Sequence, residues 1–352
     1  MFCKIFLQFF RQGAIQVKQY AIAIVGATGA VGQEFLKVMA ERDFPVGELR
    51  LLATERSAGK VLTYRGQEYT VQATTTDSFR GIDIALFAGG SASLEYGPAA
   101  VQAGAVVVDN SSNYRYQADV PLVVPEVNPE DVRWHHGIIA NPNCSTIQMV
   151  VALKPLHDVA KITRIQASTY QAVSGAGLPG LEELRQQTQD VLAGHAVTCS
   201  AFPYQIAFNV IPQIDVLQEN GYYKEEMKMA WETQKMFHDP EIRVSCTAVR
   251  VPVYRSHSES IAIETERPLS PEQAREILSQ APGVQVIDNP KEKQYPMPLF
   301  ASDTDTVYVG RIRKDISTEN GLCLWVVADQ IRKGAATNAV QIAQLLVDEG
   351  LV

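Results

Sequence analysis

The sequence predicts an α/β fold, with a doubly wound parallel sheet in the first half of the chain and a second, more β-rich domain after it. Strand-like apolar runs alternate with helix-like segments in the first half, which is typical of a parallel sheet with helices on both faces. A glycine-rich turn directly follows the first run, at residues 26–32. The chain of 352 residues is too long for one ordinary core, so we expect two domains.

The composition excludes several classes of protein. Apolar residues make up 46% and charged residues 20%, as in soluble globular proteins. The net charge of −8 argues against a general nucleic-acid surface. The five cysteines form no C-x-x-C and the six histidines no paired motif, so we expect neither a disulfide framework nor a metal site, and a reducing, cytoplasmic compartment. No stretch approaches the roughly 18 apolar residues of a membrane span.

Residues 1–18 are expected to be an extension ahead of the first strand. Their apolar residues are interrupted by Lys4 and Arg11, and no small-residue cleavage site follows. A secretory signal is therefore the less favoured interpretation.

The first strand and its turn predict a nucleotide-binding site. Tyr20–Val25 is a continuous apolar run, typical of a strand buried on both faces, and a helix is expected over Gln33–Ala40. Between them, Gly26–Gly32 has the spacing G-x-x-G-x-x-G. Such a turn brings backbone N–H groups close to a pyrophosphate at the helix N-terminus, although a plain tight turn is the simpler alternative.

The segment after the second strand, Leu49–Ala53, indicates which dinucleotide binds. Arg56 and Ser57 supply a cation and a hydroxyl group for a 2′-phosphate, which favours NADP(H). Glu55 leaves an alternative open, because NAD is expected if this carboxylate faces the ribose. Arg56 could also be a solvated loop charge.

Two further strands are expected at Ile82–Ala88 and Ala105–Asp109, with a helix at Glu95–Ala103 between them. Residues 110–115 follow the last of these strands, and ligands bind at this end of such sheets. Arg115 is therefore a candidate anion contact, with a surface arginine as the alternative.

Asn141–Thr146 joins a short apolar strand, Gly137–Ala140, to a helix expected over Ile147–Leu156. Cys144 thus lies at or near the helix start, where the dipole and free N–H groups should lower the pKa of its thiol. The same N–H groups could hold an oxyanion formed by thiolate attack on a carbonyl. A small cysteine packed under a helix is the alternative.

The second half is richer in strands. A β-segment at Ile162–Val173 ends in a glycine-containing loop, followed by helices at Leu178–Leu192 and Tyr223–Phe237. The latter helix places Glu225 and Lys228 on one face, where a surface ion pair is the simplest interpretation.

The segment Arg250–Glu259 joins β-runs at Ile242–Val249 and Ser260–Glu264. His257 is therefore expected between two strands among polar neighbours, and a cysteine with a later histidine suggests an activated thiol. The chain closes with a hairpin and a final helix, expected at Val307–Arg313, Leu322–Ala328 and Ala335–Glu349.

Together these motifs resemble the aspartate-semialdehyde dehydrogenases, from about Tyr20 onward. The resemblance rests on Gly26–Gly32, Asn141–Thr146, Gln171–Gly177, and Arg250–Val253 with His257. It implies a Rossmann-type domain formed by residues 19–143 and 330–352. It also implies an α+β domain with a mixed sheet, residues 144–329, for substrate contacts and dimerisation. A homodimer, or possibly a tetramer, is implied as well.

The resemblance also implies roles for individual residues. Cys144 would be the acylated nucleophile and His257 the acid/base. Substrate contacts would come from Gln171, Arg250 and Glu225, and phosphate contacts from Arg115 and Lys228. The residues implied in NADP binding are Gly26, Thr28, Gly29, Ala30, Val31, Arg56, Ser57, Ser174, Gly175 and Gln330.

The implied reaction is reductive dephosphorylation of L-aspartyl-4-phosphate to L-aspartate 4-semialdehyde with NADPH, through a Cys144 thioester. It belongs to the biosynthesis of lysine (through diaminopimelate), threonine, methionine and isoleucine. Two alternatives stay open at this point. One is another acyl-phosphate reductase, of the N-acetylglutamyl-phosphate or glyceraldehyde-3-phosphate type. The other is a non-catalytic NADP-binding redox sensor that uses Cys144.

Overall fold

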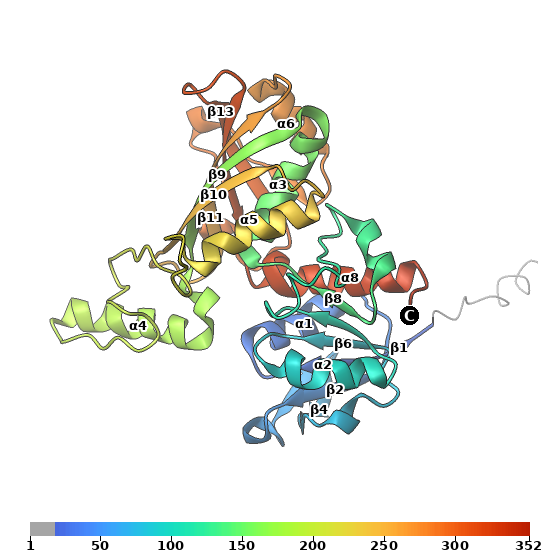
Figure 1. Cartoon of the computed structure of the whole chain (residues 1–352). Helices are drawn as coiled ribbons and strands as arrows, with labels where there is room; N and C mark the ends of the chain where they lie inside the picture. Colours follow the sequence, from blue (N-terminus) through green and yellow to red (C-terminus); the bar gives the residue numbers. More distant parts are fainter. Residues whose placement is uncertain (1–17) are drawn as a thin grey trace, which may run out of the picture.

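The computed structural model describes residues 18–352 and confirms the predicted α/β architecture (Figure 1). It contains two six-stranded sheets and a small two-stranded one. The predicted extension lies outside the described residues, apart from Lys18. Among residues 18–352, no helix is both long enough and apolar enough to cross a membrane.

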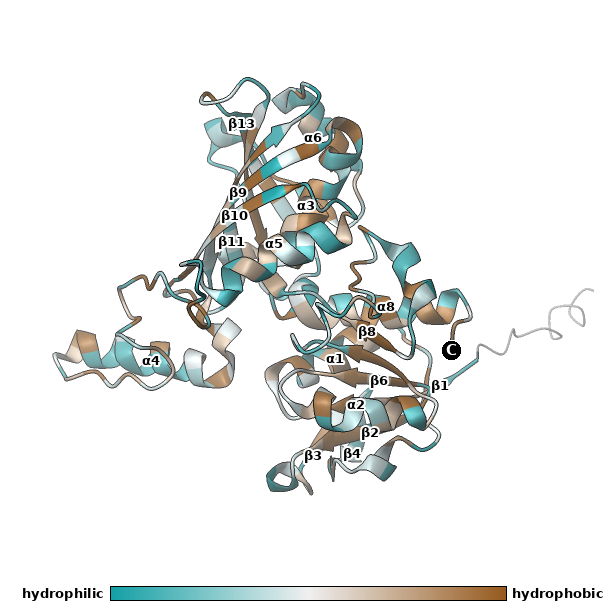
Figure 2. Ribbon diagram, viewed as in Figure 1, coloured by the Kyte–Doolittle hydropathy of each residue, from teal (hydrophilic) through white to brown (hydrophobic). Residues whose placement is uncertain are grey.

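The first sheet is parallel throughout, with the strand order β5-β2-β1-β6-β7-β8. Helices α1 and α8 pack on one face of it and α2 on the other. The elements are β1 (Tyr20–Val25), α1 (Ala30–Glu41), β2 (Val46–Ala53), β5 (Gln72–Ala73), β6 (Ile84–Phe87), α2 (Ala92–Gln102), β7 (Val106–Asp109), β8 (Ile138–Ala140) and α8 (Thr337–Asp348). Figure 2 shows apolar residues concentrated in these strands, as expected for strands buried on both faces.

A hairpin beside this sheet was not predicted from the sequence. Strands β3 (Val61–Tyr64) and β4 (Gln67–Thr70) pair antiparallel around Arg65 and Gly66, which both have positive φ. Such a two-residue turn suits a tight hairpin. Its strands are only four residues long and largely exposed, so they lack a clear apolar pattern.

The second sheet is mixed, with the order β10-β9-β11-β14-β13-β12. Its elements are β9 (Ile162–Gln171), β10 (Arg243–Arg250), β11 (His257–Thr265), β12 (Val284–Val286), β13 (Val307–Lys314) and β14 (Gly321–Ala328). The helices of this half are α3 (Cys144–Ala160), α4 (Gly177–Ala193), α5 (Lys224–Met236), α6 (Pro271–Gln280) and α7 (Pro298–Ala301).

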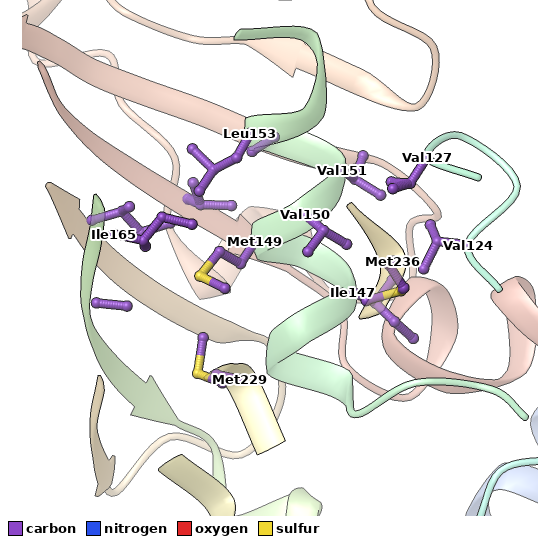
Figure 3. Close-up of a cluster of buried hydrophobic side chains, with 14 of the residues drawn as sticks. Val124, Val127, Ile147, Met149, Val150, Val151, Leu153, Ile165, Met229 and Met236 are labelled. Atoms are coloured by element: carbon purple, nitrogen blue, oxygen red, sulfur yellow. The ribbon is translucent and has the colours of Figure 1, made fainter. Parts of the chain in front are cut away.

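Helices α3, α5 and α6 cover one face of the second sheet and form its core. Figure 3 shows Met149 and Leu153 of α3 directed toward Ile165 of β9, with Met229 of α5 close by. Helix α4 projects away from the sheet (Figure 1) and packs on its own small cluster, which includes Leu184, Phe202 and Ile206. The core helix α3 therefore has a fixed position, and its first residue is Cys144.

Candidate active site

Three strand ends and one helix start converge at one edge of the second sheet. Strands β9 and β10 are parallel, and their last residues, Gln171 and Arg250, are register partners. Strand β11 runs antiparallel to β9 and begins at the same edge with His257. Helix α3 packs on one face of this sheet and starts with Cys144. Residues up to 113 positions apart in sequence, from Cys144 to His257, thus belong to one site.

The start of α3 is capped by a side chain. Asn143 Oδ1 accepts hydrogen bonds from the backbone N–H groups of Ser145 at 3.0 Å and Thr146 at 3.3 Å. The expectation that these N–H groups hold an oxyanion is therefore wrong, because the cap already occupies them. Asn143 is itself fixed, since its side chain donates to Glu225 and its N–H to Glu232.

The predicted lowering of the Cys144 pKa is also wrong for the ligand-free protein. Burial raises the pKa of the thiol to about 12, and the carboxylate of Glu225 acts in the same direction. Three nearby cations oppose this shift in part: Arg115, Arg250 and Lys228. The helix dipole is outweighed because the thiol has lost its hydration and faces a carboxylate. Cys144 is therefore a neutral thiol at rest.

His257 is completely buried as the first residue of β11, so its expected place between two strands is wrong. Its Nδ1 accepts a hydrogen bond from the N–H of Ala172 at 3.0 Å. In the neutral ring the proton consequently lies on Nε2, which has no protein partner within residues 18–352. Burial lowers the pKa of His257 to about 3, with a further contribution from Arg250. The ring is thus neutral and presents an N–H proton to the site.

Glu225 and Lys228 form a buried ion pair of 2.9 Å, so the expected surface pair is a wrong interpretation. Burial by itself raises the pKa of Glu225, but Lys228 and the hydrogen bonds from Gln171 and Asn143 lower it to about 2. Lys228 also bonds Asp215 at 2.7 Å. The carboxylate is therefore ionised and held in a fixed orientation beside the site.

Gln171 links this carboxylate to the nucleophile helix. Its Nε2 donates to Ser145 Oγ at 2.6 Å and to Glu225 at 2.9 Å. Its Oε1 is buried without a protein partner within the described chain. This unpaired oxygen can accept a hydrogen bond from a ligand.

The two arginines of the site are buried and oriented. Arg115 bonds Glu232 at 3.0 Å and the carbonyl of Asn110 at 2.8 Å, while its Nε lacks a partner in the part of the chain described. Arg250 Nη1 donates to the carbonyl of Ala172 at 2.7 Å. A Cβ added to Gly175 would lie 2.7 Å from this Nη1, so a larger residue there would displace the Arg250 guanidinium. Both guanidinium groups keep free N–H donors for an anionic ligand.

Sequence reasoning missed Glu232, which holds both Arg115 and the N–H of Asn143. Glu232 lies four residues after Lys228 and seven after Glu225 in α5, so all three lie on one helical face. This periodicity was the available signal.

The nucleotide motif forms a helix start with free donors. Gly29 is the N-cap of α1 and provides no side-chain cap. A Cβ on Gly32 would lie 2.2 Å from the carbonyl oxygen of Gly26, so glycine is required for α1 to pack so close to the turn. Gly26 has φ +83°, which also favours glycine. This open helix start fits the pyrophosphate of a dinucleotide.

Two cavities flank this helix start. One, of about 210 Å³, contains Cys144, Val31, Arg115, Ser174, Gly175 and Gln330 among its lining residues. The other, of about 460 Å³, includes Gly26, Thr54 and Glu55. The predicted NADP contacts Ser174 and Gln330 are joined by a hydrogen bond, and Gln330 also accepts from the N–H of Ser256. An extended dinucleotide could reach from the second cavity to the thiol.

The structure does not bring every predicted cofactor residue to these cavities. Glu55 lines the larger cavity, whereas Arg56 is exposed outside its lining and Ser57 is buried. The position of Glu55 at the larger cavity matches the NAD alternative, and Arg56 is the next residue in the chain.

Comparison with known proteins identifies the family. Residues 21–135 match the semialdehyde dehydrogenase NAD-binding domain and residues 153–333 the semialdehyde dehydrogenase dimerisation domain. The aspartate-semialdehyde dehydrogenase of Aquifex aeolicus is 62% identical over 338 residues, covering 95% of this chain and 99% of that protein. The chain belongs to the aspartate-semialdehyde dehydrogenase family.

Solved structures of the family agree with this assignment. Aspartate semialdehyde dehydrogenase II from Vibrio cholerae, complexed with ASA, superposes with a TM-score of 0.91 at 51% identity, covering 94% of this chain and 99% of that one. The enzyme from Candida albicans, with NADP, gives a TM-score of 0.75 at 26% identity, with coverage of 95% and 100%. The family assignment confirms the resemblance read from Gly26–Gly32, Asn141–Thr146 and the later motifs.

Proposed function

We propose that this protein is an NADP-dependent aspartate-semialdehyde dehydrogenase that reduces L-aspartyl-4-phosphate to L-aspartate 4-semialdehyde and phosphate. One observation carries the proposal. At one edge of the second sheet, beside the cavity assigned to the nucleotide, lie Cys144, His257, Gln171 and Arg250. The name of the Aquifex relative and the ASA bound to the Vibrio enzyme support this substrate.

The Cys144 thiol is neutral at rest, and in this proposal it is activated when the substrate binds. Arg250 would hold the α-carboxylate with its planar pair of donors, and Glu225 would accept from the α-amino group. Arg115 and Lys228 would receive the phosphate. The Cys144 sulfur attacks the acyl carbon, and the thiol proton passes to an oxygen of the departing phosphate. The C–O bond to phosphate breaks, and phosphate leaves with the bond electrons.

His257 completes the reaction by moving a proton at Nε2. NADPH, when bound, supplies a hydride to the carbon of the Cys144 thioester. The oxygen of that carbon accepts a hydrogen bond from His257 Nε2–H, and Gln171 orients the acyl group. As the C–S bond breaks and the aldehyde forms, His257 Nε2–H passes its proton to the Cys144 sulfur, and the ring regains a proton from solvent, which restores both the thiol and the neutral imidazole.

The preference for NADP is part of the proposal. The NADP in the Candida albicans structure supports it, and the exposed side chain of Arg56 could swing toward a 2′-phosphate. Glu55 argues for NAD. An Arg56→Ala variant should raise the KM for NADP and leave that for NAD unchanged if Arg56 holds the 2′-phosphate.

We also propose that residues 19–143 with 330–352 form the nucleotide-binding domain and residues 144–329 the catalytic and dimerisation domain. The packing of α8 against α1 and the first sheet supports this division. A homodimer is proposed because residues 153–333 match a dimerisation domain and because three large apolar side chains are exposed: Leu192 in α4, and Tyr204 and Phe208 in the segment after it. Sedimentation equilibrium would distinguish a dimer from a tetramer or a monomer.

Steady-state kinetics with aspartate semialdehyde, phosphate, and NADP or NAD in parallel tests the function. We expect phosphate-dependent NADPH formation with aspartate semialdehyde, and much slower turnover with N-acetylglutamate semialdehyde or glyceraldehyde 3-phosphate. Faster turnover of either rival aldehyde would overturn the proposed substrate. No phosphate-dependent NADPH formation with any of the three would overturn the proposed reaction.

A further inference from the structure

A buried acid that the proposed mechanism does not use lies directly beneath the site. Glu259 follows His257 by two residues on β11, so both side chains lie on the same face of the sheet. Glu259 is completely buried, and none of the ion pairs within residues 18–352 includes it. A carboxylate in this position would be a buried charge without a counter-ion, which is strongly unfavourable.

Several neighbours of Glu259 are polar, but none carries a positive charge. Its register partner on β9 is Thr169, and on β14 it is Val326. Helix α3 contributes Gln148, one turn after Cys144, and β10 contributes the thiol of Cys246. The only other titratable group on this part of β11 is the neutral ring of His257.

These neighbours leave four buried oxygens without partners within the described chain. They are both carboxyl oxygens of Glu259, Oε1 of Gln148 and Oγ1 of Thr169. A carboxylate and an amide oxygen are both acceptors and cannot bond each other, but one proton on the carboxyl group changes this. A neutral Glu259 can donate to Gln148 Oε1, so a single proton provides a hydrogen bond for two of these four oxygens.

Gln148 connects this group to the catalytic edge. Its Nε2 approaches the carbonyl oxygen of His257 at 3.5 Å, and it lies on the helix that starts with Cys144. We propose that Glu259 is a positioning residue that, as a neutral carboxylic acid, bonds Gln148 and thereby fixes the start of β11 against the start of α3. The distance between the His257 ring and the Cys144 sulfur then depends on this buried bond. The role assigned to His257 and Cys144 rests on the proposed function.

Two variants, Glu259→Gln and Glu259→Leu, test whether Glu259 acts as a neutral hydrogen-bond donor, as a charge or only as part of the packing. Glu264→Gln on the same strand is the matched control. Gln keeps the shape and a donor, so kcat should stay within about 2-fold of wild type, with an unchanged pH profile. Leu keeps the volume but not the bond. It should lower kcat roughly 10- to 100-fold, leave KM for aspartate semialdehyde nearly unchanged and shift the pH profile of kcat. Glu264, which pairs with Arg164 at the partly exposed end of β11, should tolerate Gln.

Three outcomes would overturn the inference. A loss in Glu259→Gln as large as in Glu259→Leu would mean that Glu259 acts as a charge. A lower Tm for Glu259→Leu with wild-type kcat and pH profile would mean a merely structural role. The third test depends neither on enzyme activity nor on the Glu259→Leu variant. It uses the infrared difference spectrum of wild type minus Glu259→Gln at pH 7. This spectrum should contain the C=O stretch of a protonated carboxyl group. A carboxylate band in its place contradicts the proposal, whereas absent turnover in wild type would contradict only the proposed function.

Discussion

The two helix N-termini that face the site are built in opposite ways. Helix α1 begins after Gly29 without a side-chain cap, so its first N–H groups are free for a ligand. Helix α3 begins after Asn143, whose side chain already accepts from two N–H groups of the first turn. The first helix start offers its N–H groups to an anion, whereas at the second the N–H groups of Ser145 and Thr146 are already bonded. At Cys144 the positive charge must therefore come from side chains.

This difference explains why the charged residues gather where they do. The groups that lower the pKa of Cys144 are Arg115, Arg250 and Lys228, which come from three separate segments. They must be held by partners such as Glu232 and Glu225. The nucleotide motif needs little more than glycine and a short turn. A backbone site can thus be recognised locally in the sequence, whereas a side-chain site depends on the whole fold.

The largest expected effect comes from replacing His257, the proton donor that faces the capped start of α3. His257→Asn should lower kcat about 10²- to 10⁴-fold, because general acid–base help of this size would be lost. The affinity for NADP should stay nearly unchanged. Equilibrium titration with NADP and steady-state kinetics check both, and an unchanged kcat would remove His257 from the mechanism.

The second-largest effect is expected from adding a side chain near the uncapped start of α1. In Gly32→Ala the new Cβ would lie 2.2 Å from a backbone oxygen and 2.7 Å from the Cα of Ala27, so α1 must move. Overpacking of this kind costs about 1–3 kcal/mol, which we expect in the binding free energy of NADP. Gly29→Ala is the milder comparison, since its Cβ would lie 3.4 Å from the nearest atom. Wild-type NADP affinity in Gly32→Ala would contradict the role of this close approach.

Removing the side-chain cap of α3 should have a smaller effect. Asn143→Ala leaves the N–H groups of Ser145 and Thr146 without their acceptor, at a cost of about 0.5–2 kcal/mol in the free energy of unfolding. Ser270→Ala is the matched control, because Ser270 caps α6 through Gln273 far from the site. Urea denaturation should give similar losses, whereas only Asn143→Ala should also lower kcat. Equal kcat values in the two variants would mean that the Asn143 cap has no part in orienting Cys144.

The smallest effect is a slope in the dependence of stability on pH. His257 has a pKa near 3 in the folded chain and 6.5 ordinarily, so only the unfolded chain takes up its proton between these values. The free energy of unfolding should therefore fall as the pH falls through this window. His257→Asn should flatten that slope between pH 6.5 and 5, which urea denaturation at several pH values would measure. An identical slope in both proteins would mean that His257 is not held neutral.

The sequence predicted most of the architecture because its signals are local. Continuous apolar runs marked β1 and β7, and the position of Cys144 at a helix start followed from Asn143 and the strand before it. The (i, i+3) spacing of Glu225 and Lys228 was visible, but their burial was not, since it depends on β9 and α3. The pKa directions of Cys144 and His257 were beyond reach for the same reason. Both follow from burial by segments distant in the chain, which no local pattern records.

The most direct measurement of the central claim is mass spectrometry of the acyl-enzyme. Wild-type protein incubated with aspartate semialdehyde and NADP, without phosphate, should accumulate a thioester, because the acceptor that releases the acyl group is missing. Peptide mapping should place the added mass on Cys144 alone, and Cys144→Ala should show none. Acylation of Cys199, Cys246 or Cys323 in its place, or turnover with no acyl-enzyme at all, would contradict the account.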